Sequence, residues 1–477
     1  MVEKHIQAMR NVQRIHFVGI GGAGMSGIAE VLINQGYNVS GSDICATEVT
    51  ERLARMGAQI HEGHSASYVE EKDVVVVSTA IDKTNVEVMH ASKLRLPVIS
   101  RAEMLGELMR YRYGIAVAGT HGKTTTTSLI TEIFGVSGLD PTFVVGGIVN
   151  NLGSNARLGG GNYLIAEADE SDASFLKLQP TMVVLTNIDQ DHMGTYDQKF
   201  SQLCDAFLSF ITKLPFYGVA IVCIDDLTIK KVLPQISRST LTYGFDELAD
   251  YHATNVQVDG ENWQFVVERP NELPDLAVCL PLPGLHNVLN ATAAIAIATE
   301  ENIEDHLITK AIAGFQGVGR RFETHSDIHL GQSKITLIDD YGHHPTEIKC
   351  VIDTVRAVWP KKRVLMVYQP HRYSRTRDLY KEFVRALSNV DQLFLLDVYS
   401  AGEDPIDGCS AESLSEDIYV NSGLNAVFIS DLSTVVLALE EAVEDDDILL
   451  IQGAGNVSLI SQEILSLSKF NKSERNE

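Results

Sequence analysis

Short runs of β-branched and other apolar residues alternate with helical stretches and glycine-rich turns along almost the whole chain. Strands that alternate with helices in this way are typical of α/β folds built on largely parallel sheets. The clearest strand candidates are Ile15–Val18, Asp73–Ser78, Tyr163–Ala168, Met182–Asn187, Arg363–Tyr368 and Ile448–Ile451. The pattern therefore predicts an α/β protein.

The chain has 477 residues, which is too many for one hydrophobic core, because single cores stop growing at about 250–300 residues. New strand, turn and helix units begin after residues 112 and 320. We therefore predict three domains, which span residues 1–112, 113–320 and 321–477. The first and last are expected to be Rossmann-like. The central one is expected to resemble a P-loop ATPase, with a mostly parallel sheet.

The composition argues against several kinds of partner. The chain carries 38 Lys and Arg against 63 Asp and Glu, a formal net charge of −25. Nucleic acids and anionic lipids both need clustered cations, so neither is expected to bind. The six cysteines are scattered, the first residues lack an apolar signal-peptide core, and no apolar run approaches a bilayer span. These features predict a cytoplasmic protein that acts on small molecules.

A glycine turn follows the first strand. Its pattern Gly-x-Gly-x-x-Gly lies between a strand and a helix, where glycine lets the backbone approach a diphosphate. Asp43 ends the next strand, where an acid often binds a ribose hydroxyl. The turn alone would suit an NAD(P)-dependent oxidoreductase, but a sugar nucleotide satisfies the same chemistry. The predicted substrate-binding residues here are Gly19, Gly21, Gly22, Ala23, Gly24, Met25, Ser26 and Asp43.

A second glycine loop follows the strand Gly114–Ala118 and opens a helix. Its backbone N–H groups are expected to hold the phosphates of ATP, with Lys123 on the β and γ oxygens and the Thr124 hydroxyl on Mg²⁺. The loop is a shorter variant of the usual motif, because valine stands at position 117 where glycine is common. The predicted ATP-binding residues are Gly119, Thr120, His121, Gly122, Lys123, Thr124 and Thr125.

Acidic residues follow the next strands of the same domain. Glu167, Asp169, Glu170 and Asp172 lie so close in sequence that their charges repel unless a cation lies among them. Glu167 is the predicted Mg²⁺ ligand, and the others remain open as alternatives or as parts of a solvated loop. The pair Asp191-His192 follows another strand and is a candidate for a second cation or a bound water.

Three later motifs offer further ligand-binding groups. Asn287 and Asn290 are one helical turn apart and present amide edges suited to adenine, although Asn287 could simply cap its helix. Asp339 or Asp340 is suited to a ribose. Arg372 and Arg375 could bind a carboxylate or a γ-phosphate together.

Seven motifs in order resemble those of the Mur ligases over nearly the whole chain. They are Gly19–Ser26, Gly119–Thr124, Glu167–Asp172, Asp191-His192, Gly284–Asn290, Asp339–Pro345 and His371–Arg375. The resemblance implies an ATP-dependent ligase whose first domain binds a UDP-sugar, whose central domain binds ATP and whose last domain binds an amino acid.

The resemblance also implies roles for individual residues. Thr124 and Glu167 would hold one Mg²⁺ and His192 another, with Lys123, Arg372 and Arg375 completing the catalytic set. His286, Asn287 and Asn290 would lie by ATP, Asp339 would bind its ribose, and His343 would contact substrate. Among the Mur ligases the glycine turn is most similar to the branch that joins L-alanine to UDP-N-acetylmuramate. Many other members carry a carbamoylated lysine soon after the Asp-His motif, but residues 201–210 contain no lysine.

Other functions account for fewer of these motifs. A ligase that recycles murein tripeptide would use the same sugar nucleotide. An oxidoreductase leaves Lys123 and Glu167 unexplained, and a nucleotide-dependent switch leaves the first glycine turn unexplained. A monomer or a weak homodimer is expected.

Overall fold

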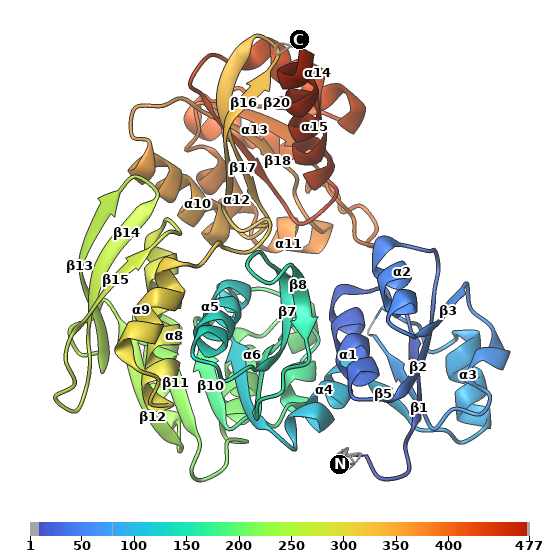
Figure 1. Cartoon of the computed structure of the whole chain (residues 1–477). Coiled ribbons are helices and arrows are strands. Elements are labelled where there is room, and N and C mark those ends of the chain that lie inside the picture. Colours follow the sequence, from blue (N-terminus) through green and yellow to red (C-terminus); the bar gives the residue numbers. More distant parts are fainter. Residues whose placement is uncertain (1–8, 79, 475–477) are drawn as a thin grey trace. The chain divides into compact units, whose positions relative to one another are not determined.

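The computed structural model of the chain describes residues 9–78 and 80–474, and its strands form three sheets (Figure 1). The chain divides into two compact units. The first comprises the residues up to 255 together with 265–278 and 289–316, and the second comprises 256–264, 279–288 and the chain from 317 onward. Three domains with mostly parallel sheets confirm the predicted fold class.

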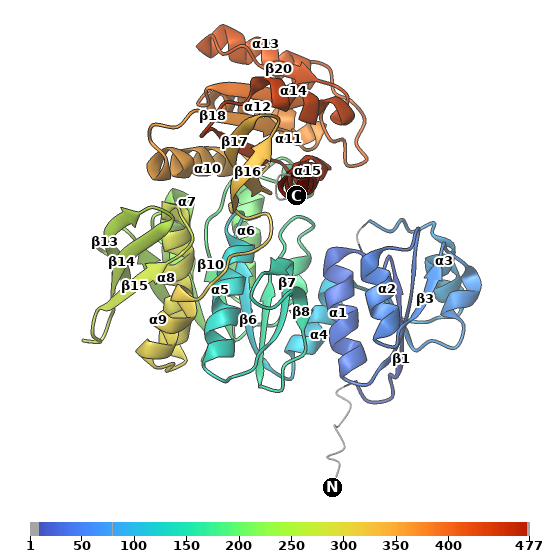
Figure 2. The ribbon, with the colours of Figure 1, turned by 45° about the horizontal axis from the view of Figure 1, so that its top comes forward.

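The N-terminal sheet has five parallel strands in the order β3-β2-β1-β4-β5. Its strands are β1 (Arg14–Val18), β2 (Asn38–Asp43), β3 (Gln59–Glu62), β4 (Val74–Val77) and β5 (Val98–Ser100). Its helices are α1 (Ala23–Asn34), α2 (Glu48–Arg55), η1 (Ala66–Val69), α3 (Val86–Lys93) and α4 (Arg101–Met109). In Figure 2, α1 and α3 lie on opposite sides of this sheet. The strand order reverses between β1 and β4, where ligands bind in folds of this type.

The central sheet has ten strands in the order β15-β14-β13-β12-β11-β10-β6-β9-β7-β8. They are β6 (Tyr113–Ala118), β7 (Thr142–Val149), β8 (Ser154–Arg157), β9 (Tyr163–Glu167), β10 (Met182–Leu185), β11 (Val219–Cys223), β12 (Ser239–Gly244), β13 (Tyr251–Asp259), β14 (Asn262–Glu268) and β15 (Leu276–Leu280). From β12 to β7 every neighbouring pair is parallel, whereas β8 pairs antiparallel with β7. The α-helices are α5 (Lys123–Val136), α6 (Phe200–Ile211), α7 (Leu227–Val232), α8 (Leu285–Glu300) and α9 (Asp305–Ala313).

The C-terminal sheet has six strands in the order β16-β17-β21-β18-β19-β20, and only the hairpin β16–β17 is antiparallel. The strands are β16 (Glu323–Leu330), β17 (Ser333–Asp340), β18 (Val364–Tyr368), β19 (Gln392–Leu396), β20 (Val427–Ile429) and β21 (Ile448–Gln452). Its α-helices are α10 (Pro345–Val358), α11 (Tyr373–Asp378), α12 (Tyr380–Leu387), α13 (Ala411–Ser422), α14 (Val435–Ala442) and α15 (Ser458–Glu474). The helices contribute to two hydrophobic clusters. One cluster contains residues of α10, α12 and α13, and the other contains residues of α14 and α15, so helices cover both faces of the sheet.

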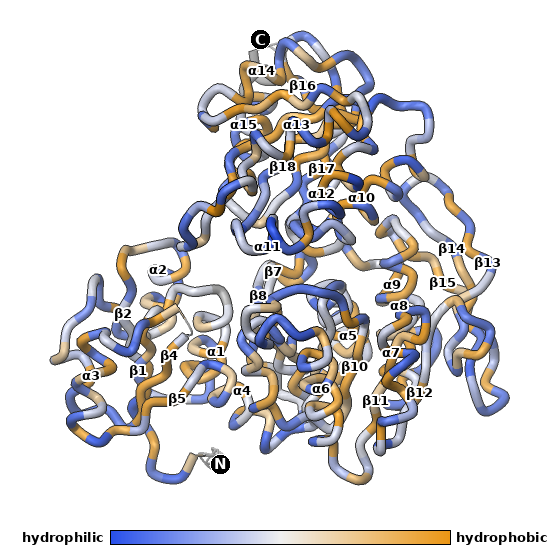
Figure 3. The backbone as a smooth tube through the Cα atoms, turned by 180° about the vertical axis from the view of Figure 1, so that it is seen from behind, coloured by the Kyte–Doolittle hydropathy of each residue, from blue (hydrophilic) through white to orange (hydrophobic). Residues whose placement is uncertain are grey.

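Buried strands explain why the parallel core could be read from sequence. A parallel strand covered by helices on both faces is apolar throughout rather than at alternate positions. β4 is four valines, and Val74, Val75 and Val76 are buried. β4 and β11 are accordingly orange in Figure 3. These strands place the glycine turns and the acidic residues at the carboxyl edges of their sheets.

Candidate active site

The loop between β6 and α5 packs tightly on the residues that follow β10. Gly119 and Gly122 have φ angles of +129° and +79°, which side chains other than glycine rarely adopt. A Cβ on Gly119 would lie 2.1 Å from the Thr186 hydroxyl and 3.0 Å from the Asn187 carbonyl oxygen. The His121 amide donates to the Asn187 side chain at 2.8 Å, and the Thr186 hydroxyl donates to the His121 carbonyl at 2.6 Å. The loop is therefore held in one shape by neighbouring backbone and side chains.

Lys123, the first residue of α5, is turned back over this loop. Its ammonium donates to the carbonyl oxygens of Gly119 and Thr120 at 2.6 and 3.0 Å, and to both carboxylate oxygens of Glu170 at 3.0 and 2.7 Å. Burial favours the neutral amine, but the carboxylates of Glu170 and Asp169 outweigh it and raise the pKa of Lys123. The lysine is therefore a fixed cation at the N-terminus of a helix, an arrangement suited to binding phosphate.

The acidic cluster after β9 carries more negative charge than its neighbours neutralise. Asp169 pairs with Arg101 at 3.0 Å and Glu170 pairs with Lys123, which leaves two cations for the four carboxylates between residues 167 and 172. Burial raises the pKa of Glu170 to about 7. The positive charge of Lys123 acts to lower this pKa, but repulsion by Asp169 partly cancels that effect. An excess of carboxylates around the buried Glu170 is a favourable environment for a divalent cation.

Glu167 lies at the end of β9, beside the strand that leads into the loop. Its backbone pairs with Val117, and one of its carboxylate oxygens accepts from the Gly146 amide at 2.7 Å. Thr124 is buried in the first turn of α5. Carboxylate and hydroxyl oxygens are the ligands that Mg²⁺ prefers, so this donor set fits the predicted cation.

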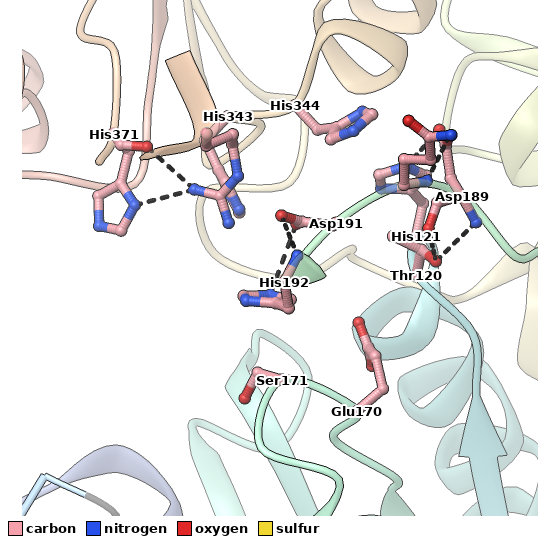
Figure 4. Close-up of polar contacts among 12 residues, drawn as sticks. Thr120, His121, Glu170, Ser171, Asp189, Asp191, His192, His343, His344 and His371 are labelled. Carbon is pink, nitrogen blue, oxygen red and sulfur yellow. Dashed lines mark hydrogen bonds and ion pairs between the residues drawn. The ribbon is translucent and has the colours of Figure 1, made fainter. Parts of the chain in front are cut away.

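The residues after β10 contact the loop directly (Figure 4). The Asp189 amide donates to the Thr120 hydroxyl at 2.9 Å, and the Asp189 carboxylate lies 3.2 Å from His121 Nε2. His192 has a φ of +53°, its amide donates to the Asp191 carboxylate at 2.8 Å, and its Nε2 lies 3.5 Å from that carboxylate. These contacts hold the segment after β10 against the loop.

Asn290 of α8 lies against the phosphate loop, although the sequence separates it from the loop by more than 160 residues. Its side-chain oxygen accepts from the Thr126 hydroxyl at 3.1 Å, and a Cβ on Gly122 would lie 2.6 Å from the same oxygen. The amide therefore fixes the start of α5. Contact with adenine stays a prediction.

Replacing Gly122 by alanine is expected to distort this start of α5. We expect a loss of about 2–3 kcal/mol in unfolding free energy and a weakening of ATP binding, because the strain of the backbone angle is joined by a clash with Asn290. Gly138 at the other end of α5 is a matched control, since its φ is +78° but a Cβ there would meet nothing within 4 Å. Gly138→Ala should lose only about 1 kcal/mol, with ATP affinity unchanged. Urea unfolding and ATP titration of both variants would contradict this account if the two behaved alike.

The glycine turn after β1 is tied to the ends of the neighbouring strands. The amides of Gly19 and Ile20 donate to the Ser42 carbonyl at 2.8 and 3.1 Å, and the Gly21 amide donates to the Asp43 carboxylate at 2.8 Å. The other oxygen of Asp43 accepts from the Ile44 amide at 2.8 Å. Asp43 thus shapes the turn in this structure, and its binding of a ribose stays a prediction.

The remaining residues of this turn begin α1. Gly22 precedes the helix and Ala23 begins it. A Cβ on Gly24 would lie 2.1 Å from the guanidinium of Arg101, so glycine leaves room for that side chain. Met25 and Ser26 are 2% and 1% exposed, so their predicted contact with substrate stays a prediction.

In the second unit, two arginines stack over one tyrosine beside the end of β17. The guanidinium carbons of Arg320 and Arg321 lie 5.2 and 4.9 Å from the centre of the Tyr341 ring. Arg320 also pairs with Asp339 at 3.5 Å and donates to the Gly453 carbonyl at 2.6 Å. Burial raises the pKa of Asp339, although the positive charge of Arg320 acts to lower it. Our sequence analysis assigned no role to these arginines, although a pair of cations in so acidic a chain was a visible signal.

Asp340 holds the turn that follows β17. One of its oxygens accepts from the Gly342 amide and the Gln452 side chain, both at 2.7 Å, and the other accepts from the Phe322 amide at 2.9 Å. These bonds occupy Asp340 in the fold, so Asp339 is the better candidate for a ribose.

The two predicted arginines follow β18, Arg372 directly before α11 and Arg375 within it. Arg372 has a φ of +72° and donates to the Glu403 carboxylate at 3.2 Å. Arg375 donates to Nδ1 and to the carbonyl oxygen of His371 at 3.1 and 3.0 Å. The His371 ring stacks on Tyr399 at 5.5 Å between centroids. The structure thus gathers both predicted arginines with His371, which begins the same motif, and with Tyr399 and Glu403, which sequence reasoning did not select.

His343 belongs to the same unit. Its ring lies 5.5 Å from the Tyr341 ring and 5.6 Å from the His371 ring. The substrate contact predicted for His343 remains a proposal, but the ring lies among the other candidate residues of this unit.

The start of α8 holds the two other predicted ATP-binding residues. The Asn287 side chain donates to the Pro283 carbonyl at 2.6 Å, which favours a local structural role at the helix start. Burial lowers the pKa of His286 to about 4, with Glu347 partly opposing it, so the imidazole is neutral near pH 7.

Three family models match consecutive parts of the chain. Their descriptions are Mur ligase family, catalytic domain (residues 14–113), Mur ligase middle domain (117–298) and Mur ligase, glutamate ligase domain (320–455). The chain belongs to the Mur ligase family. It is therefore an ATP-dependent ligase of the acid–amino-acid type. Enzymes of this family act on nucleotide sugars and amino acids.

Solved structures of three ligases are similar to this chain. The chain is 28% identical to the UDP-N-acetylmuramate-alanine ligase MurC of Thermotoga maritima, with a TM-score of 0.79 over 96% of this chain and 99% of that one. It is 23% identical to a murein peptide ligase of Psychrobacter arcticus, with a TM-score of 0.70 over 95% and 98% of the two chains. A related peptide ligase of Neisseria meningitides is 27% identical, with a TM-score of 0.59 over 65% of this chain and 100% of that one.

None of the helices between residues 9 and 474 combines the length and the apolar character that a bilayer crossing requires.

Proposed function

We propose that this chain joins L-alanine to the lactyl carboxylate of UDP-N-acetylmuramate, with hydrolysis of ATP to ADP and phosphate. The observation that carries the proposal is the match over almost the full length of both chains to an alanine-adding ligase. The glycine turn after β1 and the lysine loop after β6 support it, because together they suit one diphosphate and one triphosphate.

The reaction proceeds in two displacements. A carboxylate oxygen of the lactyl group attacks the γ-phosphorus of ATP, and ADP leaves. The amine of L-alanine then attacks the acyl carbon of the resulting acyl phosphate and loses a proton. The tetrahedral intermediate collapses to the amide and expels phosphate, which retains one oxygen of the original carboxylate.

The first displacement brings two anions together, so fixed positive charge is the main requirement. Lys123 would move from Glu170 to the β and γ oxygens of ATP, and the amides of the loop would donate to the same phosphates. Thr124 and Glu167 would hold Mg²⁺, which when bound neutralises phosphate charge. His192 is proposed for the second cation.

Arg372 and Arg375 are proposed to bind the carboxylate of L-alanine or the transferring phosphate. The pair Arg372 and Glu403 is half exposed in this structure, so an anionic substrate could replace Glu403 as the partner of the guanidinium. Asp339 is proposed for the ribose of ATP, and His286, Asn287 and Asn290 for its surroundings.

Phosphate release tests the proposal. Purified protein is incubated with ATP, Mg²⁺, UDP-N-acetylmuramate and L-alanine, and each co-substrate is left out in turn. We expect release that needs both. Release that ignores either omission would contradict the ligase reaction, and efficient turnover with the murein tripeptide in place of L-alanine would favour the recycling reaction instead.

A further inference from the structure

A buried carboxylate in the N-terminal domain joins several segments, and no step of the proposed reaction uses it. Glu87 lies in the first turn of α3 and has no exposed surface. Its oxygens are 2.7 Å from His16 Nε2, 3.0 Å from the Ser42 hydroxyl, 2.9 Å from His64 Nδ1 and 3.3 Å from the Ser65 amide. One side chain thus connects β1, β2 and the segment after β3.

The carboxylate determines which nitrogen of His64 carries a proton. Burial opposes ionisation of Glu87, but hydrogen bonds from His16, His64 and Ser42 outweigh it and lower its pKa. An ionised carboxylate can only accept, so Nδ1 of His64 must donate to it. The opposite edge of the ring, with Nε2, then faces away from Glu87. Among residues 9–78 and 80–474, no side chain or backbone group hydrogen-bonds to Nε2 of His64.

His64 lies at the carboxyl edge of the sheet, close to the diphosphate turn. It follows β3, and its side chain is 22% exposed, whereas His16 and Glu87 are completely buried. The Ser42 hydroxyl is 3.2 Å from His64 Nδ1, and the Ser42 carbonyl accepts from the Gly19 and Ile20 amides. Ser42 therefore links the His64 imidazole to the glycine turn after β1.

We propose that Glu87 is a positioning residue that orients His64, so that Nε2 of His64 hydrogen-bonds to the nucleoside diphosphate part of the substrate. The inference rests on the proposed function, since it assumes a sugar nucleotide at this edge of the sheet. A buried ion pair alone is weak evidence for a stabilising role, because apolar residues of similar volume often serve as well. The partly exposed histidine at the ligand edge gives the carboxylate a role beyond packing.

Binding measurements on three variants test the proposal. His64→Asn keeps a donor toward Glu87 but removes the Nε2 edge. Glu87→Gln leaves one acceptor oxygen where two were used. His16→Gln is the matched control, because it alters the same network at a completely buried position.

We expect His64→Asn and Glu87→Gln each to weaken binding of UDP-N-acetylmuramate, and of UDP alone, by ~10-fold in calorimetry. The KM values for ATP and L-alanine should not change. His16→Gln should lower the melting temperature but leave both affinities within about twofold of the wild type. Because Glu87 acts through His64, the double variant should bind no more weakly than His64→Asn.

Several results would contradict the inference. Wild-type affinity in His64→Asn would show that Nε2 of His64 does not contact the ligand. This variant decides the question even if Glu87→Gln does not fold. Losses that multiply in the double variant would show that Glu87 does not act through His64. A loss confined to UDP-N-acetylmuramate, with UDP unaffected, would place the contact outside the nucleoside diphosphate. Failure of the wild-type protein to bind UDP-N-acetylmuramate would instead contradict the proposed function.

Discussion

Replacing Lys123 by methionine is expected to lower the rate of phosphate release by ~10³-fold, with little change in the affinity for UDP-N-acetylmuramate. The ammonium is the cation of the loop, and methionine fills a similar volume without charge. The sugar nucleotide is proposed to bind at a different sheet, so its affinity should survive. Stopped assays of phosphate release, together with calorimetry for UDP-N-acetylmuramate, measure both quantities.

The same substitution is expected to destabilise the protein, by about 3 kcal/mol, because it leaves the buried Glu170 carboxylate without its partner. The double variant Lys123→Met, Glu170→Gln should regain most of that stability but none of the activity. Lys177→Met is a surface control, since Lys177 and its partner Glu103 are 47% and 44% exposed, and it should behave like the wild type. Equal loss of turnover and of UDP-sugar binding in Lys123→Met would contradict the assignment of the loop to ATP.

Replacing Glu167 by glutamine should raise the Mg²⁺ concentration for half-maximal activity by at least ~10-fold and lower kcat by ~10²-fold. Glutamine retains an oxygen that can accept from the Gly146 amide, so the fold should be unaffected. Only the negative charge offered to the cation is lost. Activity measured across a Mg²⁺ titration separates this effect from a general loss of activity.

Glu107→Gln is the control for that experiment. Glu107 lies on α4, half exposed and paired with Arg110, away from the acidic cluster in the sequence. Its Mg²⁺ dependence should match the wild type. If the Mg²⁺ dependence of Glu167→Gln also matched the wild type, Glu167 would not be the Mg²⁺ ligand. Asp169, Glu170 or Asp172 would then be the candidates.

The sequence predicted the parallel sheets and the position of both glycine turns between a strand and a helix, because these depend on local patterns. A buried strand, a glycine with a positive φ and a following helix are all adjacent in the chain, as in β6, Gly119, Gly122 and α5. Strand β16, the antiparallel edge of the C-terminal sheet, was not predicted. Half-exposed edge strands lack the continuous apolar runs of the central ones.

The sequence did not predict contacts between distant segments. Glu87 and His16 are 71 residues apart, and neither belongs to a motif with a characteristic spacing. Arg372 and Glu403 meet only because two consecutive parallel strands end at the same sheet edge. The sequence also did not show that Asp43 and Asp340 accept hydrogen bonds from backbone amides of the turns beside them, and these amides compete with ligands for the carboxylate oxygens.

The most direct test of the proposed function follows one oxygen atom. UDP-N-acetylmuramate with ¹⁸O in its lactyl carboxylate is incubated with the protein, ATP, Mg²⁺ and L-alanine, and mass spectrometry is applied to the products. We predict one molecule of UDP-N-acetylmuramoyl-L-alanine for each phosphate released, with one ¹⁸O atom in that phosphate. Phosphate without ¹⁸O, or released without the alanyl product, would contradict the activation of this carboxylate for attack by L-alanine.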